Sequence, residues 1–404
     1  MSLLIKNAGL PEGGQADIYI ENGVILHIRR AESGIEDYDA RVSLADRIDA
    51  SGLCVMPAFA DMHTHLRTPG QTHKETLETG CAAAVRGGYT AVCAMANTDP
   101  VCSSSEQAQF IAGEANALGL CDVFQCVSLT DGFDGKSTRH LDSLSPGGAV
   151  RCVSEDGRGV ADGAVFLEAV RKANAFGVLP LIHAEDARFS HVDTAAAEDL
   201  ETLRDLYLIE KYGCAAHFCH VSTRASAQAI LDAKQRGAAV TFEVTPHHLA
   251  LNESVDFRVN PPLRPEADRR FLLDITAAGL TDVIATDHAP HTESDKRAGA
   301  PGLVGLETAF PVCYTVLCVQ MGMPLTALIS MMSANPRRLL GMPEARLGEG
   351  FPADLVLADL NVRHTVGASG FASLGRNTPF DGMTYQGAVC AAIKGGNVVY
   401  IDDK

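Results

Sequence analysis

Eight short apolar runs recur along the middle of the chain, separated by longer amphipathic stretches. Most of these runs are continuously apolar, as expected for strands that are covered on both faces. Strands alternating with helices predict βα units and a parallel sheet, and eight such units fit a (β/α)₈ barrel. The expected strands are Leu53–Met62, Tyr89–Met95, Val123–Leu129, Ala149–Ser154, Val178–His183, Ala215–His220, Ala239–Val244 and Asp282–Thr286.

The amphipathic stretches and the chain ends complete this picture. Ala161–Phe176 and Arg224–Arg236 show the spacing expected of helices. Residues 1–56 and 344–404 instead contain short alternating pieces, such as ADIYIENGVILHIRR and ADLVLADL, separated by turns that contain glycine. We therefore expect an α/β protein in which 57–343 form a TIM-like catalytic barrel and both ends pair into a small accessory β domain.

Composition and charge narrow the class of protein. Hydrophobic residues make up 46% of the 404 residues and charged residues 21%, as in a folded globular chain. A net charge of -17 argues against nucleic acid or an anionic membrane as partner. No apolar run is long enough to span a bilayer, the first residues lack a signal-peptide layout, and the 12 cysteines form no C-x-x-C pair. We expect a cytoplasmic protein with reduced, buried thiols.

Imidazoles and carboxylates follow the ends of the expected strands. In a (β/α)₈ barrel these ends open on one face, where the chemistry takes place. A single histidine there is ordinarily a satisfied polar residue, but burying so many polar groups without partners would cost several kcal/mol, so the set predicts a metal site. The candidate ligands are His63, His65, Asp156, His183, His220 and Asp287.

Imidazole and carboxylate ligands without cysteine suit zinc with an open coordination position, and we expect one or two Zn²⁺ ions, with two favoured. Glu155 is a rival to Asp156 as the bridging carboxylate, but on an extended chain its side chain points to the other side. The expected division places one ion on His63, His65 and Asp287, the other on His183 and His220, and Asp156 between them.

Other polar residues near these strand ends have less specific interpretations. Cys219 should face away from His220 on an extended strand and pack in the core. His217 is more consistent with a structural role. His247 and His248, in VTPHHL, could line the mouth of the barrel without binding metal.

Such a site favours amide hydrolysis. Two metal ions ionise water near neutral pH, and the resulting hydroxide attacks a carbonyl carbon. A carboxylate beside it, Asp287, can take the proton and deliver it to the leaving nitrogen. The reverse reaction closes a ring with loss of water.

The motifs DMHTHLRTPG, LIHAED, FCHVST, RVNPPLR and ATDHAPH together resemble the amidohydrolase superfamily, and their order is most similar to the long bacterial dihydroorotases associated with multifunctional complexes. The resemblance covers nearly the whole chain. It implies reversible interconversion of N-carbamoyl-L-aspartate and L-dihydroorotate in pyrimidine synthesis. It also implies a set of substrate contacts, which are Arg67, Asn97, Asn260, His291, Pro301 and Gly302.

The residues themselves agree with an anionic substrate. Arg67 follows His65 by two positions, and its planar guanidinium suits a carboxylate. The chain departs from the family pattern at Ala96, where proline is usual, at Glu155, where aspartate is usual, and at Pro301, where an aromatic residue is usual. None of these departures removes an expected ligand.

Two other functions remain open at this stage. Hydantoinases and allantoinases use similar sites, but typically with a lysine-derived bridge and without the arginine at position 67. A non-catalytic dihydroorotase-like subunit of an aspartate carbamoyltransferase complex is the second alternative, although such a chain would be expected to have lost its ligands. The expected macromolecular partners are a second copy of the chain, in a homodimer, and aspartate carbamoyltransferase.

Overall fold

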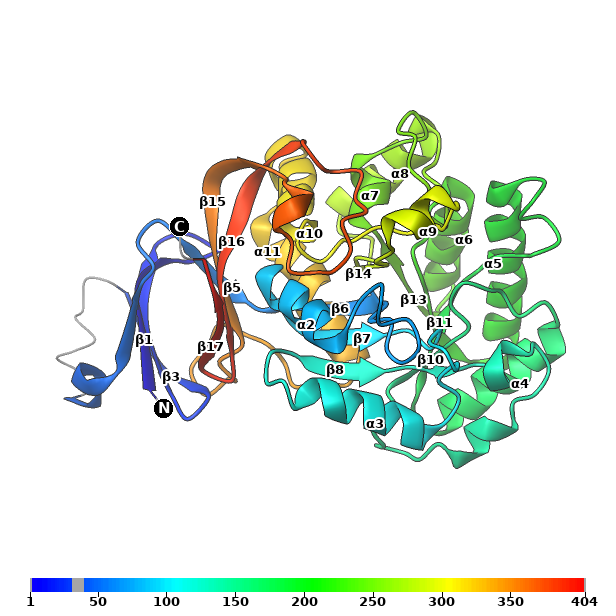
Figure 1. Cartoon of the computed structure of the whole chain (residues 1–404), viewed down its shortest axis with the longest axis horizontal. Helices are drawn as coiled ribbons and strands as arrows, with labels where there is room; N and C mark the ends of the chain where they lie inside the picture. Colours follow the sequence, from blue (N-terminus) through cyan, green and yellow to red (C-terminus); the bar gives the residue numbers. More distant parts are fainter. Residues whose placement is uncertain (1, 31–39, 403–404) are drawn as a thin grey trace.

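The computed structural model describes residues 2–30 and 40–402, and its main body is a ring of parallel strands surrounded by helices (Figure 1). Strands β6 to β8 form one parallel sheet, and β9 to β14 form another in chain order. Cys126 separates β8 from β9, and its N–H donates to the carbonyl of Ala94 at 2.8 Å. A parallel bridge between Thr64, at the end of β6, and His288, after β14, joins the last strand of the ring to the first. The predicted (β/α)₈ barrel is confirmed. Its strands are β6 (Phe59–Thr64), β7 (Tyr89–Ala94), β8 (Asp122–Gln125), β9 (Val127–Ser128), β10 (Cys152–Ser154), β11 (Leu179–Ile182), β12 (Ala215–Phe218), β13 (Ala239–Val244) and β14 (Val283–Ile284).

Helices cover the outside of this ring. Polar caps begin several of them: Asp162 accepts from the backbone of α4, and Thr223 accepts from Ser226 N of α6. Such caps contribute about 1 kcal/mol each. Gly213 ends α5 in the left-handed conformation, at φ 64°. The helices are α2 (Leu77–Arg86), α3 (Ser105–Asn116), α4 (Gly163–Ala175), α5 (Thr194–Tyr212), α6 (Arg224–Gln235), α7 (Pro246–Ala250), α8 (Glu266–Ala277), α9 (Glu293–Arg297), α10 (Ala309–Cys313), α11 (Leu325–Ile329) and α12 (Asn335–Leu339).

A second sheet lies at one side of the barrel, and both ends of the chain contribute to it (Figure 1). Its order is β17-β16-β15-β5-β1-β2-β3, with β4 paired to β1. Most neighbours in it are antiparallel, but β1 runs parallel to β4 and β5. The accessory β structure expected from the alternating ends is therefore present. Its strands are β1 (Ser2–Gly9), β2 (Gln15–Glu21), β3 (Val24–Arg30), β4 (Asp46–Asp49), β5 (Cys54–Pro57), β15 (Leu355–Thr365), β16 (Thr384–Lys394) and β17 (Asn397–Ile401).

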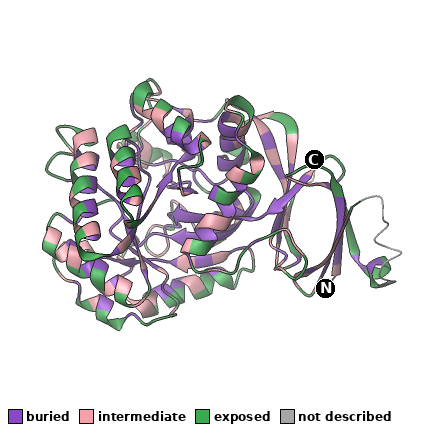
Figure 2. Cartoon of the chain, turned by 180° about the vertical axis from the view of Figure 1, so that it is seen from behind, coloured by how far each residue is buried: buried purple, intermediate pink, exposed green. Residues whose placement is uncertain are grey.

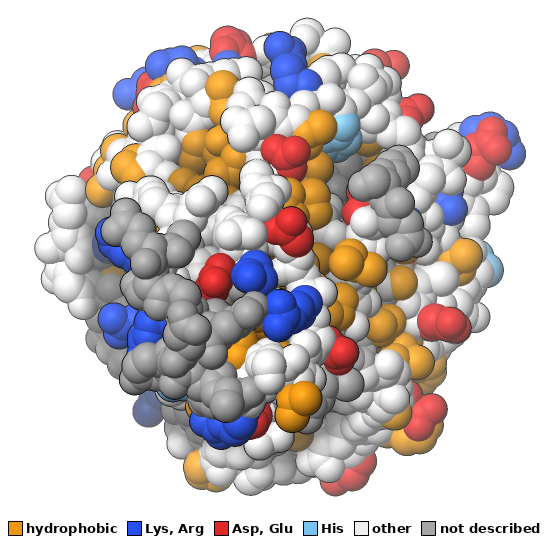
Figure 3. All heavy atoms as spheres, turned by 90° about the vertical axis from the view of Figure 1, so that its left-hand side faces the viewer, with side chains coloured by type: hydrophobic (Ala, Val, Ile, Leu, Met, Phe, Trp, Pro, Cys, Tyr) orange, Lys and Arg blue, Asp and Glu red, His pale blue; other side chains and the backbone are white. Residues whose placement is uncertain are grey.

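The main apolar core fills the barrel and also includes residues of the accessory sheet, such as Met56 and Val356. The barrel strands are buried and the outer faces of the helices are exposed (Figure 2). A separate cluster of buried apolar side chains, which includes Ile5, Ile18, Val55 and Leu357, belongs to the accessory sheet. On the face at this end of the molecule, basic, acidic and hydrophobic side chains are interspersed (Figure 3). Among the described residues, no helix is both long enough and apolar enough to cross a membrane.

The first expected strand, Leu53–Met62, is wrong as one element. It divides into β5, which pairs with β15 in the accessory sheet, and β6, which pairs with β7 in the barrel. Ala58 N still donates to Asp354 O, beside β15, at 2.9 Å, whereas the next N–H, of Phe59, donates to Gly88 O on the barrel side at 2.9 Å. The division of the chain into 1–56 with 344–404 and 57–343 stays a prediction.

Candidate metal centre and substrate pocket

The six predicted ligands meet at the carboxyl ends of the barrel strands. Each exposes 6% of its surface or less. Asp156 lies at the centre, because its Oδ1 is 3.2 Å from His63 Nε2, 3.4 Å from His183 Nδ1 and 3.6 Å from His220 Nε2. These candidate ligands lie in, or within three residues after, β6 (His63, His65), β10 (Asp156), β11 (His183), β12 (His220) and β14 (Asp287).

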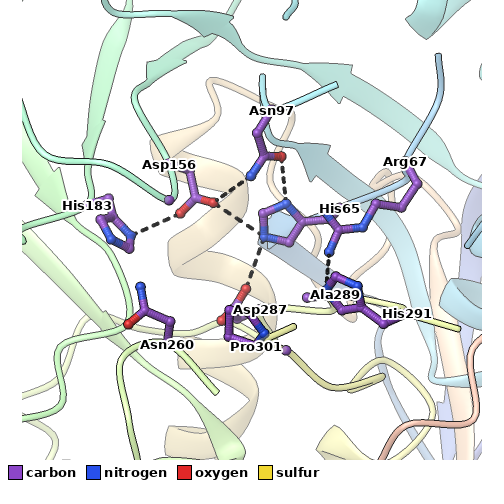
Figure 4. Close-up of a pocket in the computed structure, with 12 residues that line it drawn as sticks. His65, Arg67, Asn97, Asp156, His183, Asn260, Asp287, Ala289, His291 and Pro301 are labelled. Carbon is purple, nitrogen blue, oxygen red and sulfur yellow. Dashed lines mark hydrogen bonds and ion pairs between the residues drawn. The ribbon is translucent and has the colours of Figure 1, made fainter. Parts of the chain in front are cut away.

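Asp287 closes the other side of this cluster. Its Oδ1 lies 3.1 Å from His65 Nε2 and 3.5 Å from His63 Nε2. One compact set of potential ligand atoms therefore comprises His63, His65 and Asp287, and a second comprises His63, Asp156 and His220. Figure 4 shows His65, Asp156, His183 and Asp287 converging on the same space.

Three of the histidines have one ring nitrogen engaged away from the cluster. His63 Nδ1 donates to Glu243 Oε1 at 2.7 Å, and His183 Nε2 donates to Glu185 Oε2 at 2.9 Å. His65 Nδ1 donates to Asn97 Oδ1 at 2.9 Å. A neutral imidazole that donates from one nitrogen carries a lone pair on the other. The remaining nitrogens of these rings therefore present lone pairs to the cluster, which is how ligands of a metal are usually oriented.

A divalent cation fits this arrangement, and the unpaired atoms show why. His63 Nε2 is fully buried and has no hydrogen-bond partner. His183 Nδ1 lies 2.8 Å from His220 Nε2, within hydrogen-bonding distance, and the two nitrogens lie 3.4 and 3.6 Å from Asp156 Oδ1. An unpaired buried polar atom is costly, and a cation bound between these donors would satisfy several at once.

The electrostatics of the cluster also favour positive charge. Burial opposes protonation of His63, yet Asp156 and Asp287 raise its pKa well above the ordinary value. Burial likewise opposes ionisation of Asp287, but His63 and His65 hold its pKa below the ordinary value. The hydrogen bond from His183 lowers the pKa of Glu185 to about 2. These carboxylates are therefore ionised at neutral pH, and their combined field attracts a cation.

The sequence reasoning missed two carboxylates that hold the ligands in place. Glu243, in β13, accepts from His63 Nδ1 through Oε1 and from His217 Nε2 through Oε2 at 3.1 Å. Glu185 joins His183 to Asn260, whose Nδ2 donates to it at 2.9 Å. The sequence does contain a signal for Glu243, because it is a charged residue inside the apolar strand TFEV. A charged residue is rarely buried in such a strand without a partner.

The other polar neighbours fall into distinct places. Glu155 turns away from the cluster and accepts from the backbone N–H of Thr130 at 2.8 Å. His217 lies behind the ligands, between Glu243 and Thr241, whose Oγ1 is 2.7 Å from its Nδ1. Cys219 packs in the barrel core, as expected, and its sulfur also lies within 4.8 Å of ligand atoms of His63 and Glu243.

His247 and His248 do not border the pocket beside the cluster. Both are buried in α7. His248 bonds to Thr245 and to the carbonyl of Pro261, whereas both ring nitrogens of His247 have no hydrogen-bond partner.

The cluster opens into a cavity of about 210 Å³. The pocket that it forms is bordered by all six residues that the family resemblance assigned to substrate, which are Arg67, Asn97, Asn260, His291, Pro301 and Gly302. Figure 4 shows Arg67 and His291 together on the side away from His183. The pocket therefore has one wall of imidazoles and carboxylates and one cationic wall.

Arg67 is the cation of this pocket. It exposes 8% of its surface, and burial lowers its pKa to about 10, so it remains charged at neutral pH. Its Nε donates to Pro290 O at 3.2 Å, and its Nη2 donates to His291 Nε2 at 3.2 Å. Burial lowers the pKa of His291 to about 3, so this imidazole is neutral and carries its proton on Nδ1.

The backbone is strained at three residues of this site. Arg67, His220 and Asp287 have φ values of 56°, 33° and 49°. Residues other than glycine rarely adopt this left-handed region, and such conformations concentrate at functional sites.

We expect Glu243→Gln to lower the affinity for metal by about 10- to 100-fold, because loss of an outer carboxylate leaves a ligating histidine less basic and less well oriented. Competition with a chromophoric chelator would measure this change. Glu114→Gln, on the exposed face of α3, is the matched control. Equal affinities in the two variants would contradict the role of Glu243.

Comparisons with known proteins agree with this geometry. The amidohydrolase family model matches residues 54–399. A dihydroorotase from Clostridium botulinum (strain Eklund 17B / Type B) is 44% identical over 404 residues, which are 99% of this chain and 100% of that protein. A dihydroorotase from Halalkalibacterium halodurans is 38% identical over 430 residues, covering 99% of this chain and 98% of its own.

Among solved structures, an L-hydantoinase from Arthrobacter aurescens superposes with a TM-score of 0.84 at 24% identity, covering 100% of this chain and 96% of that one. At this identity the likeness shows the fold alone. The family model and the nearly full-length similarity carry more information, since they include the strand ends where the ligands lie. The chain belongs to the amidohydrolase family and, within it, to the dihydroorotases.

Proposed function

We propose that this chain is a zinc-dependent dihydroorotase, which closes N-carbamoyl-L-aspartate to L-dihydroorotate with loss of water and catalyses the reverse hydrolysis, in de novo pyrimidine biosynthesis. The observation that carries this proposal is a cluster of four histidines and two carboxylates, of which His65, Asp156, His183 and Asp287 border one small pocket that has Arg67 on its other wall. Nearly full-length relatives named dihydroorotase support the same substrate.

The proposed metal ligands are those of the central cluster. His63, His65 and Asp287 would hold one zinc ion, His183 and His220 would hold a second, and Asp156 would bridge them. The position of Asp156 Oδ1 beside three of the imidazoles supports a bridging role. When bound, the ions would supply ionised water near neutral pH and polarise the carbonyl under attack. The all-nitrogen-and-oxygen donor set favours zinc with an open position.

Asp287 is the proposed proton carrier. Its buried carboxylate borders the pocket and is ionised at neutral pH, so it can accept a proton there. In hydrolysis, a bond forms between the water oxygen and the ring carbonyl carbon, and the ring C–N bond breaks. The proton that Asp287 takes from the water passes to the departing nitrogen. Ring closure uses the same steps in reverse.

The cationic wall is the proposed site for the substrate carboxylate. Arg67 offers a planar pair of donors suited to a carboxylate, and His291, which accepts from Arg67 Nη2, borders the pocket beside it. Asn97 and Asn260 are already bonded to Asp156 and Glu185, so they would hold the substrate from fixed positions. Pro301 and Gly302 would close the pocket with their backbone.

A substrate panel tests the proposal. Purified protein with zinc should hydrolyse dihydroorotate with a kcat/KM far above that for hydantoin and allantoin. Arg67 is the reason for this preference, because neither of the two competing substrates carries the carboxylate that it would bind. A kcat/KM that is higher for hydantoin would overturn the assignment, and the absence of turnover of all three would favour a non-catalytic subunit.

The cellular setting is proposed on separate grounds. All twelve cysteines are free in the structure, which is typical of a reducing compartment and supports a cytoplasmic location. Family resemblance supports a homodimer and an association with aspartate carbamoyltransferase, but this is a weaker argument than site chemistry. Gel filtration of the chain alone and mixed with that enzyme would test both partners.

A further inference from the structure

One wall of the pocket is a loop that follows the short helix α9. This loop, residues 298–303, includes Pro301 and Gly302, which border the cavity. Gly302 has a φ of 126°, and a Cβ there would lie 2.7 Å from the Cβ of Ala289. Ala289 borders the same cavity. The loop therefore packs directly on a neighbouring part of the wall, and its position sets the shape of the pocket.

Lys296 holds this loop from behind. Its Nζ donates to the carbonyls of Arg258 at 2.8 Å, Ala300 at 2.9 Å and Gly302 at 2.9 Å. A lysine ammonium has three N–H groups, so its donors are fully used by backbone from two separate segments. The ammonium also lies 4.3 Å from the ring centre of Phe257. No carboxylate is among these contacts, and all three of these hydrogen bonds from Lys296 go to backbone carbonyls.

Asn377 reaches the same carbonyl from a distant part of the chain. Its Nδ2 donates to Gly302 O at 2.9 Å and to Ala289 O at 3.2 Å. Its Oδ1 accepts from the backbone N–H of His291 at 3.0 Å. One side chain thus joins the loop to the strip that carries Ala289 and His291.

We infer that Lys296 and Asn377 are positioning residues of the substrate pocket, which fix the Gly302 carbonyl between them and hold the loop against Ala289 and His291. Neither side chain borders the cavity, so they act through the backbone that does. The inference rests on the proposed function for the identity of the substrate. In chemical terms, how well the pocket binds a small cyclic amide depends on hydrogen-bond donors of two side chains that lie outside the pocket.

Two substitutions test this inference. Lys296→Met keeps the aliphatic length but removes three donors, and Asn377→Asp keeps the shape but places an oxygen against two carbonyls. Each should raise the KM for dihydroorotate by roughly tenfold while kcat changes by less than about threefold, since the loop contributes binding shared by the ground and transition states. Arg297→Met, on the same helix and exposed, should leave both constants unchanged.

A third variant separates the effect of the hydrogen-bond geometry of Lys296 from the effect of its charge. Lys296→Arg keeps the positive charge, but its planar guanidinium does not reproduce the three directions of an ammonium. If positioning matters, its KM should rise as in Lys296→Met. A wild-type KM for Lys296→Arg would assign the effect to charge and overturn the inference.

Hydrogen exchange provides a readout that is independent of turnover. In both Lys296→Met and Asn377→Asp, the amides of residues 298–303 should exchange faster than in the wild type, with melting temperatures within a few degrees of it. Unchanged exchange and unchanged KM would overturn the inference and leave the proposed function intact. A wild-type protein that fails to hydrolyse dihydroorotate would overturn the function, while exchange would still decide whether the two side chains hold the loop.

Discussion

Asp287→Asn should lower kcat for dihydroorotate hydrolysis by about 10²- to 10⁴-fold, the range expected when a general acid–base group is lost. The amide has nearly the same shape, so packing at this buried position is kept, but it does not accept a proton from water at neutral pH. The measurement is kcat from initial rates of hydrolysis at saturating zinc.

Two controls make the Asp287→Asn result specific. Asp287 is also a proposed ligand, so the zinc content of the variant must be measured with its rate. Zinc retained by His63 and His65 together with a large loss of kcat would support the proton-carrier role. Asp256→Asn, at an exposed position, should behave as the wild type. A near-normal kcat in Asp287→Asn would contradict the proposal.

Removal of metal should abolish turnover and lower thermal stability together. Without a cation, the buried Nε2 of His63 has no hydrogen-bond partner, and the carboxylates of Asp156 and Asp287 lie 3.2 and 3.5 Å from it with no metal ion to neutralise their charge. A ligand that binds only the folded state stabilises it by about 4 kcal/mol at a concentration 1,000 times its Kd. Chelation should therefore lower the melting temperature by several degrees, and added Zn²⁺ should restore both activity and stability.

Calorimetry with metal analysis would measure both effects of metal removal on one sample. His63→Ala is the matched variant, because it removes the residue shared by both compact ligand sets. In this variant the shift in melting temperature caused by chelator should shrink markedly. Full activity in wild-type protein that contains almost no metal would exclude the metal-dependent mechanism.

The barrel and the convergence of the six side chains could be predicted because their signals are local. A strand buried on both faces is a continuous apolar run, and parallel strands in a barrel bring all their carboxyl ends to one face. His183 and Asp287 each follow such a run in the sequence. Their position at the barrel mouth is therefore determined by the strand that precedes each of them. The pair His63 and His65 lie two residues apart, so they face the same side.

The residues that support the site carry no local signal. Glu243 is 180 positions from His63, to which it bonds, and Asn377 is 75 positions from Gly302. Contacts of this kind depend on how the barrel closes and on how the C-terminal segment returns to it. The pattern also did not show that Leu53–Met62 serves two sheets. A continuous apolar run fits either sheet equally well, and the choice depends on long-range pairing with β15 and β7.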